Sequence, residues 1–269
     1  MIKKFILIAF FCVFANASLN VKIQNILGST EYNTHRNLIN HIFSNENTYY
    51  SNGKIDYARV SQELQNNGLL KLNLPSTQDI DVTFHISGNA KKSIKSLSDI
   101  LKVLGHQYFI TKEEIVVDNN FKWTIKVKTA SAISPLRLSQ ELQGINCIIL
   151  DIKREGNYKW TYSIDMGNAY VYKAENLVDN NRLSLKKPLK PYMIRVQNSS
   201  RISIDSNAGN SWYPSVTFYD NDLNILDIHE ENSLQKNLRI SVPSNTKYIK
   251  IDDLYTLANL KRGINITKE

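Results

Sequence analysis

Apolar residues between positions 54 and 166 follow two spacings in turn, one typical of helices and one typical of strands. Three predicted helices are each followed by two strand-like runs. Their apolar faces are Tyr57, Val60 and Leu64; Ile94, Leu97, Leu101 and Leu104; and Leu138 and Leu142. Each helix is predicted to end at a glycine, namely Gly68, Gly105 and Gly144. This alternation predicts an α+β fold for the region.

The same region contains an internal repeat. Residues 59–65 read RVSQELQ, and residues 137–143 read RLSQELQ. A second match relates NFKWT at residues 120–124 to NYKWT at residues 157–161. The helices and their terminal glycines recur about every 38 residues, which indicates one small module used three times. Repeated modules usually bury and present surface, so the array favours an interaction protein over an enzyme.

The order of elements predicts how these modules combine into a sheet. The last strand of unit one, with units two and three, gives the order βαββαβ and an additional edge strand. This is a ferredoxin-like arrangement, a twisted antiparallel sheet with helices on one face. Residues 121–127 alternate between apolar and polar side chains, as expected when the sheet face that carries no helices is exposed to solvent. In unit one, residues 70–74 and 82–86 are predicted as separate strands because Pro75 ends the first.

The flanking regions have different patterns. Residues 18–53 are predicted to contain a helix with Leu38, Ile39, Ile42 and Phe43 on one face. Beyond residue 167 the chain has short β-type runs separated by Asn, Gly, Pro and Ser, which predict an all-β sandwich or jelly roll. The runs are residues 169–172, 192–196, 201–204, 215–219, 238–242 and 248–251. The predicted domains are therefore residues 18–53, 54–166 and 167–269, after a leader at 1–17.

The first 17 residues have the features of a secretory signal peptide. Lys3 and Lys4 precede an apolar run from Phe5 to Phe14, and the sequence ANA at 15–17 is a cleavage site. The run is too short for a permanent membrane-spanning helix, which disfavours an uncleaved anchor. Lipidation of Cys12 is excluded because a bulky phenylalanine precedes it. We expect cleavage after Ala17 and a periplasmic protein.

Charge and cysteine content narrow the class of partner. The formal net charge is +8, or +6 without Lys3 and Lys4, and the basic residues are dispersed. The densest group, residues 186–190 (KKPLK), resembles a proline-punctuated linker, so a nucleic-acid groove is not expected. Any contact with a membrane is expected to pass through partner proteins. The mature chain keeps only Cys147, which lies in an apolar run and is predicted to be buried without a disulfide.

No motif for catalysis or cofactor binding was found. The chain lacks a G-x-S-x-G elbow, a P-loop, a G-x-G-x-x-G loop and H-E-x-x-H. The histidines have no zinc-binding helical spacing; they are His35, His41, His85, His106 and His229. We therefore expect no enzyme and no cofactor.

Four residues in the C-terminal part are candidate contacts for a ligand or partner. Asp220 and Asp222 suggest a calcium loop together with Asp227, although aspartates in a hairpin usually serve the turn. Trp212 and Tyr213 suggest a sugar-stacking platform, although an isolated tryptophan more often closes the end of a core.

A further aromatic stripe lies in the third unit. Tyr158, Trp160 and Tyr162 form either a binding ladder or part of the core, and their period of two opposite a polar stripe favours the core.

The array at residues 54–166 resembles the small α/β modules strung in tandem in periplasmic parts of bacterial secretion, pilus and flagellar machines. The segment from Trp212 to Leu226 (WYPSVTFYD, then NDLNIL) resembles bacterial jelly-roll modules of the carbohydrate-binding or pre-peptidase type. The first resemblance implies a scaffold that docks onto an envelope assembly, with a flagellar-motor accessory as the most specific version. The second leaves a glycan- or peptidoglycan-binding protein as the alternative.

Overall fold

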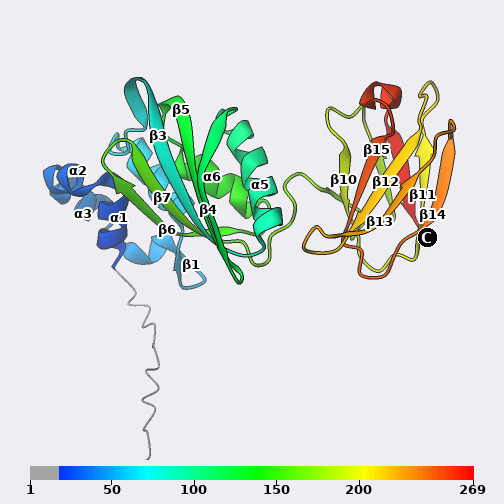
Figure 1. Cartoon of the computed structure of the whole chain (residues 1–269). Coiled ribbons are helices and arrows are strands. Elements are labelled where there is room, and N and C mark those ends of the chain that lie inside the picture. The colour runs from blue at the N-terminus through cyan, green and yellow to red at the C-terminus, as the bar shows by residue number, and fades with distance from the viewer. Residues whose placement is uncertain (1–17) are drawn as a thin grey trace, which may run out of the picture.

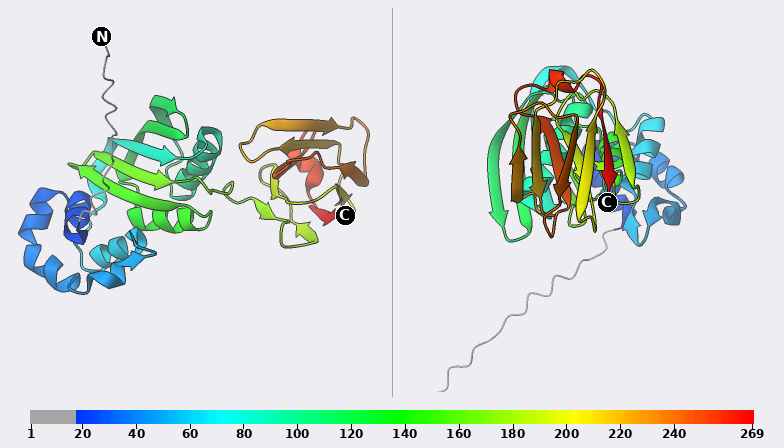
Figure 2. Two further views of the ribbon diagram at one scale, coloured as in Figure 1. Left: turned by 90° about the horizontal axis from the view of Figure 1, so that it is seen from below. Right: turned by 90° about the vertical axis from the view of Figure 1, so that its right-hand side faces the viewer.

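The computed structural model describes residues 18–269, so the predicted signal peptide lies outside the described residues. The protein is an α+β protein with two hydrophobic clusters. The first cluster runs from Leu19 to Tyr172 and the second from Leu177 to Ile266. Figures 1 and 2 show the two parts side by side, connected by the segment that follows strand β7 (Lys159–Asp165).

The N-terminal segment is a set of short helices rather than one long helix. It contains α1 (Leu19–Leu27), α2 (Ser29–Thr34), α3 (Arg36–Ile42), a 3-10 turn η1 (Glu46–Tyr49) and the small strands β1 (Tyr50–Ser51) and β2 (Lys54–Ile55). Ile39 and Phe43 are buried as predicted. Leu38 is exposed, so its predicted place on the buried face is wrong. Gly28, with φ of +84°, separates the first two helices.

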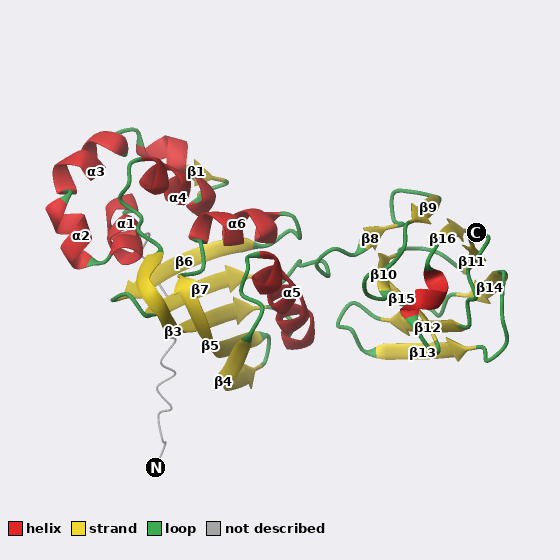
Figure 3. Cartoon of the chain, turned by 90° about the horizontal axis from the view of Figure 1, so that it is seen from above, coloured by secondary structure: helices red, strands yellow, loops and turns green. Residues whose placement is uncertain are grey.

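A five-stranded sheet forms the middle of the molecule, in the order β4-β5-β3-β7-β6 (Figures 1 and 3). Its elements along the chain are α4 (Tyr57–Asn66), β3 (Asn73–Ser87), α5 (Ala90–Val103), β4 (Phe109–Val117), β5 (Asn120–Ser131), α6 (Pro135–Gln143), β6 (Ile148–Glu155) and β7. Two helix–hairpin units thus bracket the central strand β3. Strand β3 is antiparallel to β5 but parallel to β7. The prediction of a wholly antiparallel sheet is therefore wrong at its centre, because side-chain alternation does not encode strand direction.

The first unit also differs from the prediction. The structure has one strand, β3, where two strands were expected, and Pro75 lies inside it. The pairing of β3 with β5 shifts register between Asn73 and Gln78, so Pro75 falls where the ladder is irregular. A residue without an N–H is tolerated at such a bulge because no ladder hydrogen bond is required of it.

The three larger helices end in related ways. After α4 and α5, Gly68 and Gly105 adopt φ of +70° and +100°, the left-handed region that a glycine enters without strain. After α6, Gly144 is still right-handed, and Asn146 takes the left-handed position with φ of +61°. The predicted helix end at Gly144 is confirmed, but the left-handed residue is Asn146, because asparagine also tolerates this conformation.

Aromatic side chains hold the centre of the first core. The ring centroid of Phe84 on β3 lies 5.7 Å from that of Trp123 on β5 and 5.8 Å from that of Tyr162 on β7. Trp160 and Tyr162 are buried, so the core interpretation is confirmed for these two, whereas Tyr158 is half-exposed. On the opposite face, the hydroxyls of Thr83 and Thr124 are 3.0 Å apart. The sheet therefore has one buried and one polar face, as predicted.

The C-terminal part contains two sheets that share the second cluster. One has the order β13-β12-β15-β10-β8 and the other β14-β11-β16-β9. The elements are β8 (Glu175–Asn176), β9 (Arg182–Leu185), β10 (Tyr192–Arg195), β11 (Arg201–Ser206), β12 (Pro214–Tyr219), β13 (Ile225–Glu230), β14 (Asn237–Ser241), β15 (Tyr248–Asp253), the 3-10 turn η2 (Leu257–Leu260) and β16 (Ile264–Lys268). Residues 169–172 were predicted as a strand but form a loop, in which Ala169, Val171 and Tyr172 are buried at the junction of the two parts and Tyr170 is exposed.

Candidate functional site

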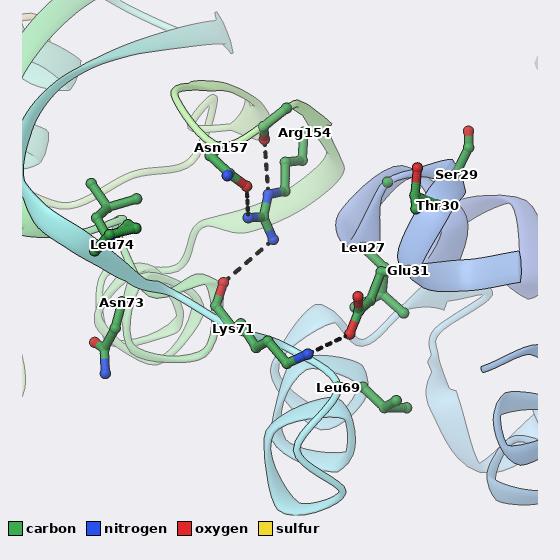
Figure 4. A pocket seen from close by; sticks show the side chains of 13 residues that line it. Leu27, Ser29, Thr30, Glu31, Leu69, Lys71, Asn73, Leu74, Arg154 and Asn157 are labelled. Atoms are coloured by element: carbon green, nitrogen blue, oxygen red, sulfur yellow. Dashed lines mark hydrogen bonds and ion pairs between the residues drawn. The ribbon is translucent and has the colours of Figure 1, made fainter. Parts of the chain in front are cut away.

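A cleft of about 560 Å³ lies where the N-terminal helices meet the sheet (Figure 4). Its walls come from the α1–α2 junction, the segment before β3 and the β6–β7 turn. The Lys71 ammonium lies 2.9 Å from the Glu31 carboxylate. That hydrogen bond, together with the positive charges of Lys71, His35 and Arg154, outweighs partial burial and lowers the pKa of Glu31.

Arg154 is the other cation of this cleft. Its guanidinium donates to the carbonyls of Gly156 and Lys71 and to the side-chain oxygen of Asn157. It also lies 5.0 Å from the centroid of the Trp160 ring. These donors close the β6–β7 turn onto the segment before β3. The charges in this cleft therefore join three chain segments, and the cleft is best understood as a structural joint.

The most exposed apolar strand of the sheet is β4, at one edge. Tyr108, just before it, is 89% exposed and Ile110 is 69% exposed. Ile115, Val116 and Val117, at its other end, are also exposed. Among the described strands, β4 pairs with β5 alone, so the backbone groups of its outer side have no strand partner. A free edge with β-branched side chains is a template for pairing with another chain.

Two of the three charged residues in the middle of β4, Lys112 and Glu113, form ion pairs within the protein, and Glu114 is exposed. The Lys112 ammonium lies 2.6 Å from the Asp81 carboxylate, and the Glu113 carboxylate lies 2.6 Å from the Lys122 ammonium. A register shift between Thr111 and Glu113 marks a bulge at this point. Charges and bulges usually protect a sheet edge from other strands. Here the protection is confined to the centre of β4, and both apolar ends stay exposed.

The opposite edge of the sheet is covered. Helix α1 packs against β6, as Figure 3 shows. The Lys22 ammonium lies 3.1 Å from the Asp151 carboxylate, which also accepts a hydrogen bond from the Tyr57 hydroxyl. The two edges therefore differ, and only the β4 edge offers an apolar surface.

The predicted contact residues Asp220 and Asp222 lie in the hairpin between β12 and β13. The Asp220 carboxylate accepts hydrogen bonds from the backbone N–H groups of Asp222 and Asn224 and from the Asn224 side chain. These bonds lower the pKa of Asp220 despite some burial. Its oxygens therefore close the turn. Among residues 18–269, no three His, Cys, Asp or Glu side chains are grouped as a metal would need.

The other predicted pair, Trp212 and Tyr213, is split between core and surface. Trp212 is fully buried, and its indole N–H donates to the carbonyl of Asp252. A sugar cannot stack on a buried ring, so the predicted platform role of Trp212 is wrong. Tyr213 is partly exposed, and its ring contacts that of Tyr255 edge-to-face, with centroids 5.0 Å apart. Tyr255 is 65% exposed, and it was missed because no spacing pattern in the sequence relates it to Tyr213.

Cys147 is the free cysteine of the described residues, and it is buried, as predicted. Burial, assisted by the nearby Asp165 carboxylate, raises the pKa of its thiol to about 12. A thiol with such a pKa is a weak nucleophile at neutral pH. His106 is also buried, and burial with the neighbouring Arg137 lowers its pKa.

Comparisons of this chain with protein-family models, curated proteins and solved structures found no match. None of the helices in residues 18–269 combines the length and apolarity that crossing a bilayer requires.

The apolar runs of β4 are visible in the sequence, but their position at an open edge is not. Two apolar runs of the sequence, residues 108–110 and 115–117, lie at the two ends of this one edge strand, Phe109–Val117. Their edge position depends on strand order, which no local pattern specifies. The signal that could have found them is the charged centre, Lys-Glu-Glu at 112–114, because charges inside an apolar strand are typical of edges.

Proposed function

We propose that this chain is a non-enzymatic protein of the bacterial periplasm that docks onto a larger cell-envelope assembly, such as a flagellar motor. The single observation that carries the docking is the open apolar edge at β4, beside a covered edge at β6. Location in the periplasm is supported by the charged, apolar and small-residue pattern of residues 1–17.

The finer architecture is part of the same proposal. Strands β3, β4 and β5 with the crossover helix α5 support the first half of a ferredoxin-like unit; after α6, the hairpin β6–β7 takes the place of its fourth strand, with β7 beside β3 and β6 at the edge. The two sheets of the C-terminal part support a jelly-roll-like sandwich. In this proposal the two parts are separate domains. The ferredoxin-like part docks onto the assembly, and the sandwich is attached to it.

The partner that fits β4 is an extended segment of another envelope protein. An added strand would satisfy the unpaired backbone groups, which gives affinity. Apolar side chains on that segment would cover Ile110 and Val116, which gives register and specificity. In the centre of β4, Lys112 and Glu113 form ion pairs with residues of the same chain. These pairs leave the outer backbone groups of β4 accessible.

The experiment that tests this proposal is in-cell cross-linking of the tagged chain, followed by affinity purification and mass spectrometry. A defined stoichiometric complex with envelope components is expected. The double variant Ile110→Lys/Val116→Lys is expected to lose it, because burying unpaired ammonium groups in a strand interface is costly. A monomer without partners, or a complex unchanged in the double variant, would refute the β4 edge as the docking site.

A matched control is available on another edge strand. Ile228 on β13 is also exposed, and β13 is the outer strand of its sheet. Ile228→Lys is expected to leave the complex intact. Equal loss in this control would mean that added charge, and not the β4 edge, disrupts the assembly.

Glycan binding is a second candidate, and the Tyr213–Tyr255 pair favours it. An exposed tyrosine ring braced by another ring is a suitable surface for a pyranose. If this site operates, Tyr255→Ala abolishes retention on peptidoglycan while Tyr158→Ala, at another half-exposed tyrosine, does not. Unchanged retention in Tyr255→Ala would remove this candidate.

A further inference from the structure

The loop between β9 and β10, residues 186–191, presents a leucine between lysines. Leu189 is 96% exposed, the highest value among the large apolar side chains of residues 18–269. Pro188, directly before it, is buried and fixes the backbone of the loop. The lysines at 186, 187 and 190 are all exposed. The loop therefore presents one apolar side chain surrounded by ammonium groups.

Two contacts hold this loop in place. The Tyr192 hydroxyl donates to the carbonyl of Lys186 at 2.6 Å, and the Lys190 ammonium lies 3.1 Å from the Asp99 carboxylate on α5. The loop is thus braced at both ends, by its own strand and by the first part of the molecule. Leu189 is exposed on a supported loop, so its exposure is a fixed property of the surface.

The surroundings of the loop are strongly basic. A cleft of about 580 Å³ lies beside it, lined by Lys95, Lys173, Lys186, Lys187, Lys190 and Lys250. Glu175 is the carboxylate in the lining. Asp99, just outside it, is paired with Lys95 and Lys190, and Asp252 with Lys250. Within residues 18–269, the ammonium groups of Lys186 and Lys187 are in no ion pair, and that of Lys173 lies 5.3 Å from the centroid of the Tyr172 ring, so all three can contact an external anion.

We propose that the lysine–leucine loop, residues 186–191, binds the surface of an anionic phospholipid bilayer. An acidic peptide would match the lysines but would have to supply a deep pocket for a side chain as protruding as Leu189. A fluid layer of acyl chains surrounds such a side chain from all sides without a preformed pocket. Lysine stems are long and apolar, so their ammonium groups reach the headgroups while Leu189 enters the boundary region. This contact is independent of the β4 edge.

Sedimentation with vesicles tests the proposal directly. The chain from residue 18 onward, which contains every described residue and lacks the apolar run at 5–14, is mixed with phosphatidylcholine vesicles with or without phosphatidylglycerol. Binding is expected only with phosphatidylglycerol, and it is expected to weaken as salt increases. Lys186→Gln/Lys187→Gln is expected to lower the partition coefficient by about fivefold per lysine, and Leu189→Ser by about tenfold.

A second loop provides the matched control. Leu234, which is 48% exposed, and Lys236 lie in the loop between β13 and β14. Leu234→Ser and Lys236→Gln are expected to bind vesicles as the unchanged chain does. Equal binding to neutral and anionic vesicles, or equal losses in the two loops, would overturn the proposal.

A fluorescence measurement keeps the proposal testable if sedimentation is weak. Cys147 is buried and protonated, so a polarity-sensitive thiol dye attached to a Leu189→Cys variant reports on the loop alone. A blue shift is expected with vesicles containing phosphatidylglycerol and not with pure phosphatidylcholine. No shift in either case, with folding verified by circular dichroism, would overturn the proposal.

Discussion

At the scale of single residues, the aromatic cluster on β3, β5 and β7 is the part of the core that the sequence predicts best. Alternating apolar residues placed Trp123 and Tyr162 on the buried face, and both are buried. The pattern could not show that Phe84 stands between them, because cross-strand neighbours depend on strand order. The same limit applies to Trp212, whose burial depends on strands far along the chain.

Replacing Phe84 with alanine is expected to destabilise the protein strongly. The change removes a buried ring that contacts Trp123 and Tyr162, and such truncations cost about 3–5 kcal/mol in the free energy of unfolding. Urea denaturation followed by tryptophan fluorescence measures it. The control is His85→Ala, the next residue on the opposite, exposed face, which is expected to cost less than about 0.5 kcal/mol. A small effect at Phe84 would show that the core can collapse around the cavity.

The Asp99 carboxylate makes stability depend on pH. Burial raises its pKa, but the ammonium groups of Lys95 and Lys190 outweigh burial and leave the pKa below its usual value. A group whose pKa is lower in the folded state stabilises the protein above its unfolded pKa and loses that contribution as pH falls. Asp99→Asn is therefore expected to lower stability by about 1 kcal/mol near neutral pH. The difference is expected to shrink as pH falls below the ordinary pKa of an aspartate and the carboxylate becomes protonated.

Thermal unfolding of both forms at several pH values checks this dependence. A Glu155→Gln variant serves as control, because that carboxylate pairs with Lys153 at the surface. Its effect is expected to be smaller at every pH. A constant difference between Asp99→Asn and the unchanged chain at all pH values would contradict the ionic origin of the effect.

At the scale of elements, helices were predicted more accurately than strands. The helical spacing places α4 and α6 correctly, and in the structure the side chains of Asp56 and Ser134 cap these helices by accepting hydrogen bonds from backbone N–H groups of the first turn. The strand errors have a common cause. The first half of β3 was not predicted as part of this strand because residues 75–79 lack apolar side chains in alternation. The apolar run at 169–172 was predicted as a strand, but it lies in a loop at the junction of the two parts. Alternation reports burial, and burial is not unique to strands.

A glycine in the turn before β16 provides a test of close backbone packing. Gly263 has φ of +76°, and a Cβ there would lie 1.9 Å from the carbonyl oxygen of Leu185 on β9. Gly263→Ala is expected to cost more than about 3 kcal/mol, because left-handed strain of about 1–2 kcal/mol adds to the clash. Chemical denaturation measures the loss.

The control for this prediction has the same backbone strain without the clash. Gly209 has φ of +91°, and its Cβ would meet only the Arg262 side chain at 3.6 Å. Gly209→Ala is expected to cost about 1–2 kcal/mol. Equal losses at the two positions would mean that β9 moves aside at little cost.

At the scale of the whole molecule, the two parts contact each other through the segment after β7. The backbone N–H of Val171 donates to the hydroxyl of Tyr248 on β15, and the N–H of Tyr172 donates to the hydroxyl of Ser96 on α5. At the start of α5, the ammonium groups of Lys91 and Lys92 donate hydrogen bonds to Asn224 and Asn221 of the β12–β13 hairpin. No local pattern predicts such contacts, because each joins residues far apart in sequence.

Removal of the Tyr248 hydroxyl is expected to loosen this junction. In Tyr248→Phe the buried N–H of Val171 loses its acceptor, which costs about 1–3 kcal/mol. Hydrogen exchange measured by mass spectrometry is expected to show faster exchange at residues 169–172 and unchanged protection in β5. Tyr192→Phe, which removes a hydroxyl bonded to Lys186 instead, is expected to leave residues 169–172 protected. Equal protection in both variants would show that the hydroxyl of Tyr248 does not secure the junction.

The unequal edges of the central sheet also set a limit on assembly. A sheet that is open at both sides can recruit strands without end and grow into a fibre. Because α1 covers β6, only one edge of this sheet, β4, can accept a further strand. If a strand pairs with β4, this sheet can grow no further, either with one partner per copy or with two copies back to back. Removal of α1 would uncover β6, so that this sheet could accept a strand at each of its two edges.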